Sequence, residues 1–310
     1  MRLSIVICAY NVDKYIQECV DSIIFNKIDY EIILVNDCST DRTKEILDQY
    51  KEREEIKLID LDQNKGVSVA RNIGMKHASG EFLIFIDGDD YINSQILEEK
   101  IENLIDEEIY IGNFNSIYED TLNIPYESEF KGLKKDSGEV IFSELFLSSI
   151  TGSIWKAIYK RDFLLKSNLF FTPDIVIAED LDWLVKVILE AKNAVFDSEF
   201  RFYNYRIRSN SVMRSSYNLK KYNDSLVIVK SIQEIKKNKN LARKTFQKID
   251  LVCFALLIQA IGSYRGKINN SEIISISNEI YLKEFKYKIV KFLIKRYTSI
   301  LRFLLRFKYK

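Results

Sequence analysis

The chain has 310 residues, of which 47% are hydrophobic and 29% charged, with only two prolines and ten glycines. This length and composition allow a full hydrophobic core and exclude a disordered or linker-rich chain. The four cysteines show no Cys-x-x-Cys spacing, which argues against a zinc site and favours a reducing compartment. We expect no signal peptide, because Met1 and Arg2 lead directly into a strand-like run.

The net charge of +1 hides two oppositely charged parts. Residues 1–200 carry 21 Lys+Arg and 39 Asp+Glu, a net charge of −18, whereas residues 201–310 carry 25 and 6, a net charge of +19. A basic C-terminal third favours an anionic surface such as a membrane or a nucleic acid. The longest uncharged stretch, residues 251–264, is too short to cross a bilayer, which needs roughly 20 residues.

The first hundred residues alternate between strand and helix patterns. Apolar runs predict strands at 3–9, 31–35, 56–61 and 82–86, and helical spacing predicts helices at 13–25, 41–50, 67–77 and 93–104. This alternation predicts a parallel sheet with right-handed crossovers. The loops at the carboxyl ends of such strands lie at one edge of the sheet, where ligands bind.

The middle of the chain is less regular, and the last third is helical. Strand-like segments occur at 109–118, 129–131 and 195–205, and helical ones at 138–149, 178–191, 218–238, 241–262 and 272–308. We therefore place a domain boundary near residue 215, between an α/β domain at 1–215 and a helical region at 216–310.

Three carboxylates crowd together where the strand at 82–86 ends, on Asp87, Asp89 and Asp90. Such close carboxylates repel one another unless a cation lies among them, and Mg²⁺ or Mn²⁺ suits hard oxygen ligands and a substrate phosphate. An isolated Asp-x-Asp is more often a solvated acidic turn. Its place at a strand end favours a metal site at Asp87 and Asp89.

Three further loops, at 8–11, 36–41 and 64–72, follow the other parallel strands. Together with the acidic loop they offer an aromatic ring, carboxylates and a guanidinium. This set suits a nucleotide diphosphate, with Tyr10 near the base, Asp37 at a base edge, and Arg71 and the metal on the phosphates. The alternative interpretation is ordinary loop polarity and packing.

Several motifs, at 4–11, 35–41, 70–74, 78–81 and 85–90, resemble in their order those of the family-two inverting glycosyltransferases. The resemblance implies the GT-A fold, a nucleotide-sugar-binding α/β sandwich with a mostly parallel, Rossmann-like sheet, here with an α-helical C-terminal extension. It makes 1–105 the nucleotide-binding half and 106–215 the acceptor half. The implied donor contacts are Ala9, Tyr10, Asn11, Asp37, Arg71, Asp87 and Gly88, with Asp87 and Asp89 on the metal.

Residues 178–182, Ala-Glu-Asp-Leu-Asp, are similar to the segment that carries the catalytic base of this family. The resemblance makes Asp180 the candidate general base, with Glu179 or Asp182 as the next candidates. An acidic first turn of a helix, favoured by the helix dipole, is the alternative interpretation. In an inverting transfer the base takes the proton of the acceptor hydroxyl, a contribution of roughly 10²–10⁴-fold in rate.

Two later segments imply weaker contacts to the acceptor or to phosphate. Residues 155–159 resemble the Trp-x-Lys-Leu-Tyr of the family, but Ala157 stands at the lysine position, so Trp155 and Lys156 are the candidates there. Residues 205–211 resemble the Tyr-Arg-x-Arg-x-x-Ser of capsule and O-antigen enzymes, which makes Arg206 and Arg208 candidates. Alternation along a strand end is the other interpretation of the two arginines. Glu179 is a further candidate for a contact to the acceptor or to phosphate.

Residues 283–310 contain ten Lys+Arg and one Glu, with apolar residues at helical spacing. This pattern predicts an amphipathic helix on an anionic membrane. We expect a cytoplasmic protein that is peripheral on the inner face of the cell membrane. The alternative is a helix that packs against the acidic domain.

We therefore expect a hexosyl- or N-acetylhexosaminyltransferase that uses Mn²⁺ or Mg²⁺. It would move a sugar from a nucleotide-diphosphate sugar, most commonly a UDP-sugar in this family, to a hydroxyl of a glycan or lipid-linked oligosaccharide. A phosphatase of the haloacid dehalogenase type would carry Asp-x-Asp after its first strand, and a sugar nucleotidyltransferase would carry a Gly-rich basic loop there. A nucleic-acid-binding protein would not carry an acidic domain that repels its ligand, so we expect no nucleic acid partner.

Overall fold

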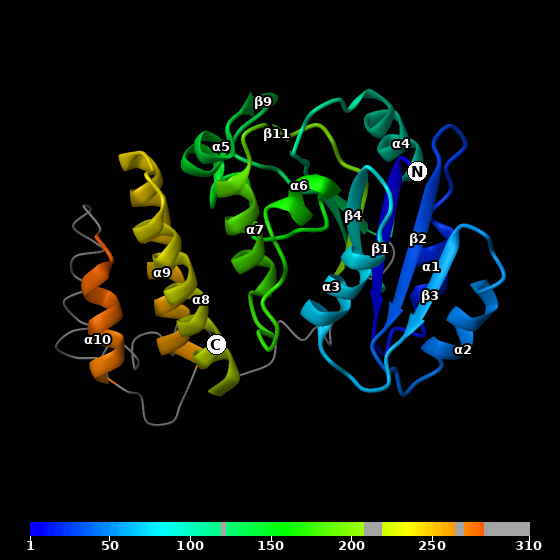
Figure 1. Ribbon diagram of the computed structural model, residues 1–310, viewed down its shortest axis with the longest axis horizontal. Coiled ribbons are helices and arrows are strands. Elements are labelled where there is room, and N and C mark those ends of the chain that lie inside the picture. The colour runs from blue at the N-terminus through cyan, green and yellow to red at the C-terminus, as the bar shows by residue number, and fades with distance from the viewer. Residues whose placement is uncertain (119–121, 208–218, 264–269, 282–310) are drawn as a thin grey trace.

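The computed structural model describes residues 1–118, 122–207, 219–263 and 270–281 (Figure 1). Its larger sheet contains β1 (Leu3–Ala9), β2 (Tyr30–Asn36), β3 (Ile56–Asp60), β4 (Phe82–Asp87), β6 (Ile109–Ile111), β9 (Leu133–Asp136), β10 (Ala157–Lys160) and β11 (Ala194–Asp197). These eight strands are arranged in the order β3-β2-β1-β4-β10-β6-β11-β9. The strand order confirms the predicted α/β class with a mostly parallel sheet.

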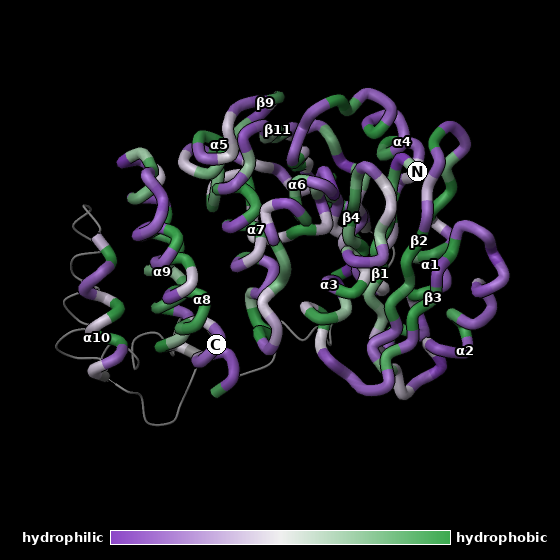
Figure 2. Tube along the Cα trace, viewed as in Figure 1, coloured by the Kyte–Doolittle hydropathy of each residue, from purple (hydrophilic) through white to green (hydrophobic). Residues whose placement is uncertain are grey.

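The four strands β1 to β4 are parallel neighbours and lie in residues 1–105, the half predicted to bind the nucleotide. β1, β2 and β4 are largely apolar because both faces of this part of the sheet are covered, and Ile5, Ile33 and Ile84 are fully buried, whereas the edge strand β3 is only partly buried. Figure 2 shows these strands as a hydrophobic centre. The chain runs outward from β1 to β3 and returns on the other side of β1 to β4. The switch point between β1 and β4 is where open α/β sheets bind ligands.

Helices cover both faces of this half. The first helices are α1 (Ile16–Asp21), α2 (Thr43–Leu47), α3 (Val67–His77) and α4 (Ser94–Asn103). Right-handed crossovers put α3, which packs on β1 and β2, on the face opposite α1 and α2. The predicted helices at 13–25 and 41–50 are shorter than expected, and the second ends in the 3₁₀ turn Asp48–Tyr50.

A smaller sheet contains β5 (Tyr91–Ile92), β7 (Phe114–Tyr118), β8 (Leu122–Pro125) and β12 (Tyr203–Ile207), in the order β5-β12-β7-β8. The predicted strands at 109–118 and 195–205 were wrong as single strands, because each one crosses from the larger sheet to the smaller one. The first crossing is at Gly112, where an added Cβ would lie 2.4 Å from the backbone oxygen of Phe200. Only glycine fits where the two crossings approach so closely.

Other predicted boundaries in the middle of the chain were also wrong. The edge strand is β9 rather than 129–131, and β10 was not predicted at all. The remaining helices are α5 (Gly138–Leu145), α6 (Arg161–Lys166), α7 (Glu179–Glu190), α8 (Leu219–Asn238), α9 (Arg243–Ser263) and α10 (Asn270–Glu279). The predicted helix 272–308 ends at Glu279 in its described part, and residues 283–310 lie outside the described residues.

The C-terminal helices form a layer at the end of the molecule away from β3 (Figure 1). α8 and α9 pack against each other and against α7 and α5, and α10 contacts both. Among the described helices, α9 is long and apolar enough to cross a membrane by length and composition, over Arg243–Gly262. The uncharged residues 251–264, taken alone, had predicted a segment too short to cross a bilayer. Because 56% of the most apolar part of α9 is buried inside the molecule, and core helices pass the same test, α9 is weak support for a membrane span.

Candidate active site

The carboxyl ends of β1, β2 and β4 are joined by backbone hydrogen bonds. The N–H of Asp37 donates to the carbonyl oxygen of Ala9 at 2.9 Å, and the N–H of Gly88 donates to that of Cys8 at 3.2 Å. Both Ala9 and Gly88 are buried, and a Cβ at Gly88 would lie 3.1 Å from Val12. The predicted donor loops therefore lie together at the switch point of the sheet.

Asn11 connects the loop after β1 to the loop after β2. Its side-chain oxygen accepts the N–H of Thr40 at 2.8 Å, and its own N–H donates to Ser39 at 3.2 Å. Asn11 has a φ of +52° and Cys38 a φ of +58°, a left-handed conformation that is uncommon for non-glycine residues, although asparagine adopts it more readily than most. Tyr10, beside this connection, is 47% exposed, so its ring is accessible to a nucleobase.

Asp37 is only 3% exposed and fixes the loop that leads into α3. Its carboxylate accepts the N–H of Lys65 at 2.7 Å and that of Gly66 at 2.8 Å. Each carboxylate oxygen retains acceptor capacity beyond these bonds. The contact of Asp37 to a base edge stays a prediction, and the structure adds this positioning role to it.

Arg71 is the centre of the site. Its side chain is 3% exposed and contacts Asp87 at 2.9 Å, Asp180 at 2.5 Å and Glu179 at 3.4 Å. The guanidinium also lies over the ring of Phe171, at 5.3 Å from the ring centroid. One buried cation on α3 thus joins the end of β4 to the start of α7. The predicted contact of Arg71 to phosphate stays a prediction.

The start of α7 places two acidic residues against Arg71 and turns the third away. Asp182 is 1% exposed and accepts hydrogen bonds from Lys186 at 2.5 Å and Thr172 at 2.9 Å. The preceding Ala178 has a φ of +62°, a strained conformation for a residue with a side chain. This geometry favours Asp180 or Glu179 over Asp182 as the base.

The environment of Asp180 suits a group that exchanges protons near neutral pH. Burial, opposed by the charge of Arg71 and reinforced by the carboxylates of Glu179 and Asp87, raises the pKa of Asp180 to about 8. Burial also raises the pKa of Glu179. A general base is most effective when its pKa lies near the working pH.

Residues of β12 hold the acidic loop after β4 in place through hydrogen bonds. Asp90 is 1% exposed and accepts hydrogen bonds from the hydroxyl of Tyr203 at 2.8 Å and the N–H of Arg206 at 2.7 Å. Arg206 Nε donates to the carbonyl oxygen of Asp89 at 3.0 Å, and Arg206 Nη2 donates to Glu18 at 2.6 Å. Contacts of Arg206 to phosphate stay a prediction, and Arg208 lies outside the described residues. The sequence carried no signal for Tyr203.

The acidic loop fits a divalent cation by its chemistry. Within the described ranges no three His, Cys, Asp or Glu residues gather as a metal cluster. Mg²⁺ needs only one or two protein carboxylates when substrate phosphates complete its shell, and the half-buried Asp87 and Asp89 supply two. Burial raises the pKa of Asp90 well above its usual range, and the nearby carboxylates of Asp89 and Asp87 add to this shift. A cation at this loop would oppose the repulsion among these carboxylates.

Trp155 and Lys156 lie under the smaller sheet. The Trp155 ring stacks on Tyr203 at 4.4 Å and on Tyr205 at 5.3 Å between centroids. Lys156 is fully buried and its ammonium lies 5.6 Å from the ring centroid of Phe114. Trp155 therefore adjoins Tyr203, the residue that holds the acidic loop, and Lys156 lies beside Phe114. Their contact to an acceptor stays a prediction.

Residues 4–166 match the sequence profile of the family described as Glycosyl transferase family 2. The chain belongs to that family. The match confirms the resemblance seen in the motifs, and favours the glycosyltransferase interpretation over the phosphatase, nucleotidyltransferase and nucleic-acid-binding alternatives.

Relatives in sequence include glycosyltransferases of bacterial cells. The uncharacterized glycosyltransferase EpsJ of Bacillus subtilis strain 168 is 32% identical over 221 residues, which are 69% of this chain and 64% of EpsJ. The poly(ribitol-phosphate) β-N-acetylglucosaminyltransferase TarS of Staphylococcus aureus is 31% identical over 225 residues, which are 70% of this chain and 38% of TarS. The matched part is thus less than two thirds of either relative.

Solved structures confirm the GT-A fold. A crystal structure of the TarS 1–349 fragment of S. aureus with UDP-GlcNAc superposes with a TM-score of 0.73 and 21% identity, over all of this chain and 90% of that one. The mannosyltransferase PcManGT of Pyrobaculum calidifontis, in complex with GDP-Man and Mn²⁺, gives a TM-score of 0.54 and 15% identity over 98% and 86% of the two chains. At these identities the likeness shows the fold.

Proposed function

We propose that this protein is an inverting glycosyltransferase that moves a sugar from a UDP-sugar to a hydroxyl of a glycan or lipid-linked acceptor. The observation that carries the proposal is the buried Arg71, which joins Asp87 at the end of β4 to Asp180 at the start of α7. A donor-binding carboxylate and a candidate base are thereby held on one cation. The UDP-GlcNAc complex of TarS supports a UDP-linked donor, and the polymer in its name supports a surface-glycan acceptor.

The donor would lie across the ends of β1, β2 and β4. The exposed ring of Tyr10 stacks on the base, Asp37 accepts from a base edge, and the loops held by Asn11 close around the nucleoside. Asp87 and Asp89 would hold Mn²⁺ or Mg²⁺, which supplies Lewis-acid stabilisation of the diphosphate leaving group when it is bound. The Mn²⁺ in the complex of PcManGT supports this assignment.

Transfer then needs one proton acceptor. The acceptor oxygen attacks the anomeric carbon, its proton passes to Asp180, and the bond from that carbon to the UDP oxygen breaks with inversion. Arg71 acts as a positioning residue that holds the Asp180 carboxylate in place. The raised pKa of Asp180 gives its carboxylate the basicity that a proton acceptor needs near neutral pH.

A panel of UDP-, GDP- and dTDP-sugars tests this function without a known acceptor, because water can replace the acceptor hydroxyl. We expect release of UDP that needs Mn²⁺ or Mg²⁺ and stops with a chelator. Asp180→Asn should bind UDP like the parent and release it from the sugar far more slowly. If no sugar nucleotide is hydrolysed, or if hydrolysis ignores both chelator and Asp180, the proposal is wrong.

We further propose that residues 283–310 dock the enzyme on the inner face of the cell membrane, beside a membrane-borne acceptor. The support is their ten Lys+Arg against one Glu, since each basic residue near an anionic surface contributes about 1 kcal/mol. Deletion of 283–310 should abolish binding to anionic liposomes and spare donor hydrolysis. An intact protein that ignores anionic liposomes at low salt would contradict this docking.

A further inference from the structure

Lys156 carries a buried ammonium group for which the described part of the protein supplies no hydrogen-bond partner. The residue is 0% exposed, and its Nζ is among the buried side-chain atoms left without a partner. The rings of Phe114 and Tyr126 lie near it, each with its centroid 5.6 Å away. Two aromatic faces offset only part of the cost of burying an unpaired cation. A buried lysine in this state is expected to serve a ligand or a reaction.

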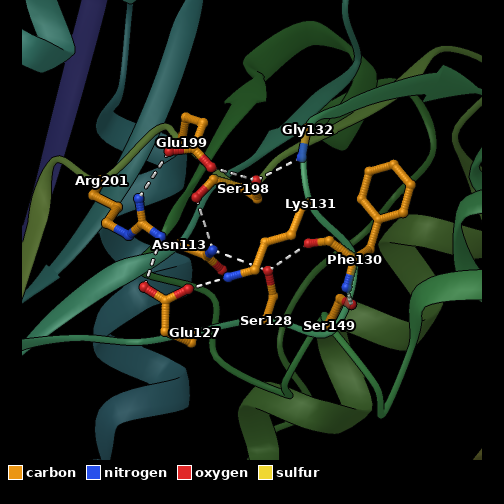
Figure 3. A network of polar contacts seen from close by, with 10 residues as sticks. All are labelled: Asn113, Glu127, Ser128, Phe130, Lys131, Gly132, Ser149, Ser198, Glu199 and Arg201. Atoms are coloured by element: carbon orange, nitrogen blue, oxygen red, sulfur yellow. Dashed lines mark hydrogen bonds and ion pairs between the residues drawn. The ribbon is translucent and has the colours of Figure 1, made fainter.

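Two other buried side-chain atoms in the same part of the described protein are also unpaired. Asn113, directly before Phe114, has a buried side-chain oxygen without a partner, and Arg201 has a buried Nε without one. Arg201 donates through its other nitrogens to Glu199 and Glu127, at 3.4 and 3.5 Å. Figure 3 shows Arg201 between these two carboxylates, next to Asn113. Unsatisfied polar groups therefore gather around the segment that follows β8.

That segment is otherwise firmly held. Asn113 Nδ2 donates to Ser128 at 3.1 Å, the N–H of Phe130 donates to Ser149 at 2.8 Å, and the N–H of Gly132 donates to Ser198 at 2.8 Å (Figure 3). Buried polar groups in an ordered network normally find partners. The missing partners are thus a property of a well-fixed region.

Aromatic stacking connects Lys156 to the donor site. Tyr126 stacks on Phe114 at 4.7 Å, Trp155 packs edge-on against Phe114 at 4.9 Å, and Trp155 stacks on Tyr203 at 4.4 Å. Tyr203 in turn donates to Asp90 in the acidic loop. An apolar, aromatic lining with a few polar groups is the usual character of a ligand site. The lysine therefore lies in the predicted acceptor half, and the packed rings of Phe114, Trp155 and Tyr203 lie between it and the acidic loop.

We propose that Lys156 is the cation of an acceptor subsite, and that its Nζ binds an anionic group of the acceptor, either a phosphate or a carboxylate. This inference rests on the proposed glycosyltransferase function. Because Nζ is fully buried, binding requires the half-buried ring of Tyr126, which directly follows the edge strand β8, to rotate away while its backbone stays bonded to Phe114. The bound anion then accepts a charge-assisted hydrogen bond from the ammonium, which has no partner among the described residues. Burial alone lowers the pKa of Lys156 to about 7, so a bound anion should raise it.

Matched anionic and neutral probes test the subsite. Binding of ribitol 5-phosphate against ribitol, and of glucuronic acid against glucose, is measured by calorimetry in the presence of UDP and Mn²⁺. In the parent protein we expect one anionic probe to bind about tenfold more tightly than its neutral partner. Lys156→Met should abolish this preference, and Lys160→Met, a half-buried lysine outside the aromatic stack, should keep it.

Several outcomes would overturn the inference. It fails if the parent shows no preference for either anionic probe, or if Lys156→Met retains one. Inorganic phosphate that binds as tightly as ribitol 5-phosphate would mean a simple anion site instead of an acceptor subsite. A probe that binds without raising the titration midpoint of the Lys156 side chain, followed by lysine ¹³Cε NMR, would also contradict it.

Donor hydrolysis separates this failure from failure of the function itself. The parent and the control Lys160→Met should both release UDP from the donor sugar in a metal-dependent way. A parent that hydrolyses the donor but fails the probe tests overturns the subsite alone. A parent that hydrolyses no sugar nucleotide overturns the function on which the subsite rests.

Discussion

The two halves of the α/β domain treat their buried polar groups differently. In the nucleotide-binding half, Asp37 holds two backbone N–H groups, Arg71 contacts three carboxylates, and Asp90 accepts from a hydroxyl and an N–H. In the acceptor half, Lys156 and Asn113 each leave a buried polar atom without a partner among the described residues. On the predicted donor side these polar groups are paired within the protein, whereas the predicted acceptor side retains the unpaired groups that we propose a ligand completes.

Removing Arg71 should have the largest effect on the protein, because Arg71 pairs with three carboxylates at once. Arg71→Met would leave Asp87, Glu179 and Asp180 crowded without their cation. We expect a loss of about 3–5 kcal/mol in the free energy of unfolding, measured by urea denaturation. Arg71→Lys keeps the charge without the planar fork and should lose less. If Arg71→Met unfolds at the parental urea concentration, the three contacts do not stabilise the protein.

Replacing Asp180 tests the junction between the halves. Asp180→Asn should lower the rate of sugar transfer, with water or an acceptor, by about 10²-fold or more and leave UDP affinity unchanged. The neighbouring Glu179→Gln serves as the control and should lower it much less. Since the pKa of Asp180 is raised to about 8, its basic form accumulates as pH rises, and the parental rate should increase up to that pH. If Asp180→Asn transfers sugar at the parental rate and Glu179→Gln loses transfer, the base is Glu179 instead of Asp180.

Lys156→Met should change stability in the opposite direction from Arg71→Met. Burial lowers the pKa of Lys156 to about 7, so between this pH and its unfolded pKa the unfolded chain binds more protons than the folded one. The parent should therefore gain stability as pH rises from 7 to about 10. Lys156→Met should remove that slope and be more stable at pH 7, by a gain on the order of 2 kcal/mol. Thermal unfolding across this range, with Lys160→Met as the control, checks the sign. A Lys156→Met protein less stable than the parent at pH 7 would contradict an unpaired charge.

The acidic loop should give the smallest of these effects. Asp89→Asn removes one expected metal ligand while the half-buried Asp87 stays in place. We expect Mn²⁺-dependent UDP affinity to fall by about tenfold or more, measured by calorimetry with and without chelator. If this variant binds UDP as tightly as the parent and a chelator has no effect, the donor site does not use a metal at the acidic loop.

The nucleotide-binding half could be predicted well from the sequence because its signals are local. Apolar runs such as 3–9 and 82–86 correspond to β1 and β4, and the polar loops after them meet at the sheet edge. The contact between Arg71 and Asp180 joins residues that are 109 positions apart, and no periodicity encodes such a pairing. The role of Tyr203 was missed for the same reason, since its partner Asp90 is 113 positions away.

The acceptor half was harder to predict because tertiary contacts override its local patterns. The run 109–118 alternates like one strand, but the close approach of Phe200 at Gly112 splits it between two sheets. β9 was missed because Leu133 is its only apolar residue, and it pairs at the sheet edge through its backbone. The family motif predicted Trp155 and Lys156 as contacts, yet burial of the ammonium emerged only from the packing of the smaller sheet.

The configuration of the released sugar tests the central claim most directly. The parent protein is incubated with Mn²⁺ and the sugar nucleotide that it hydrolyses, and the anomeric proton of the product is followed by ¹H NMR before mutarotation. For an α-linked donor such as UDP-GlcNAc, single displacement by water activated at Asp180 predicts that the β-anomer appears first. Initial release of the α-anomer would contradict an inverting transfer with Asp180 as the base.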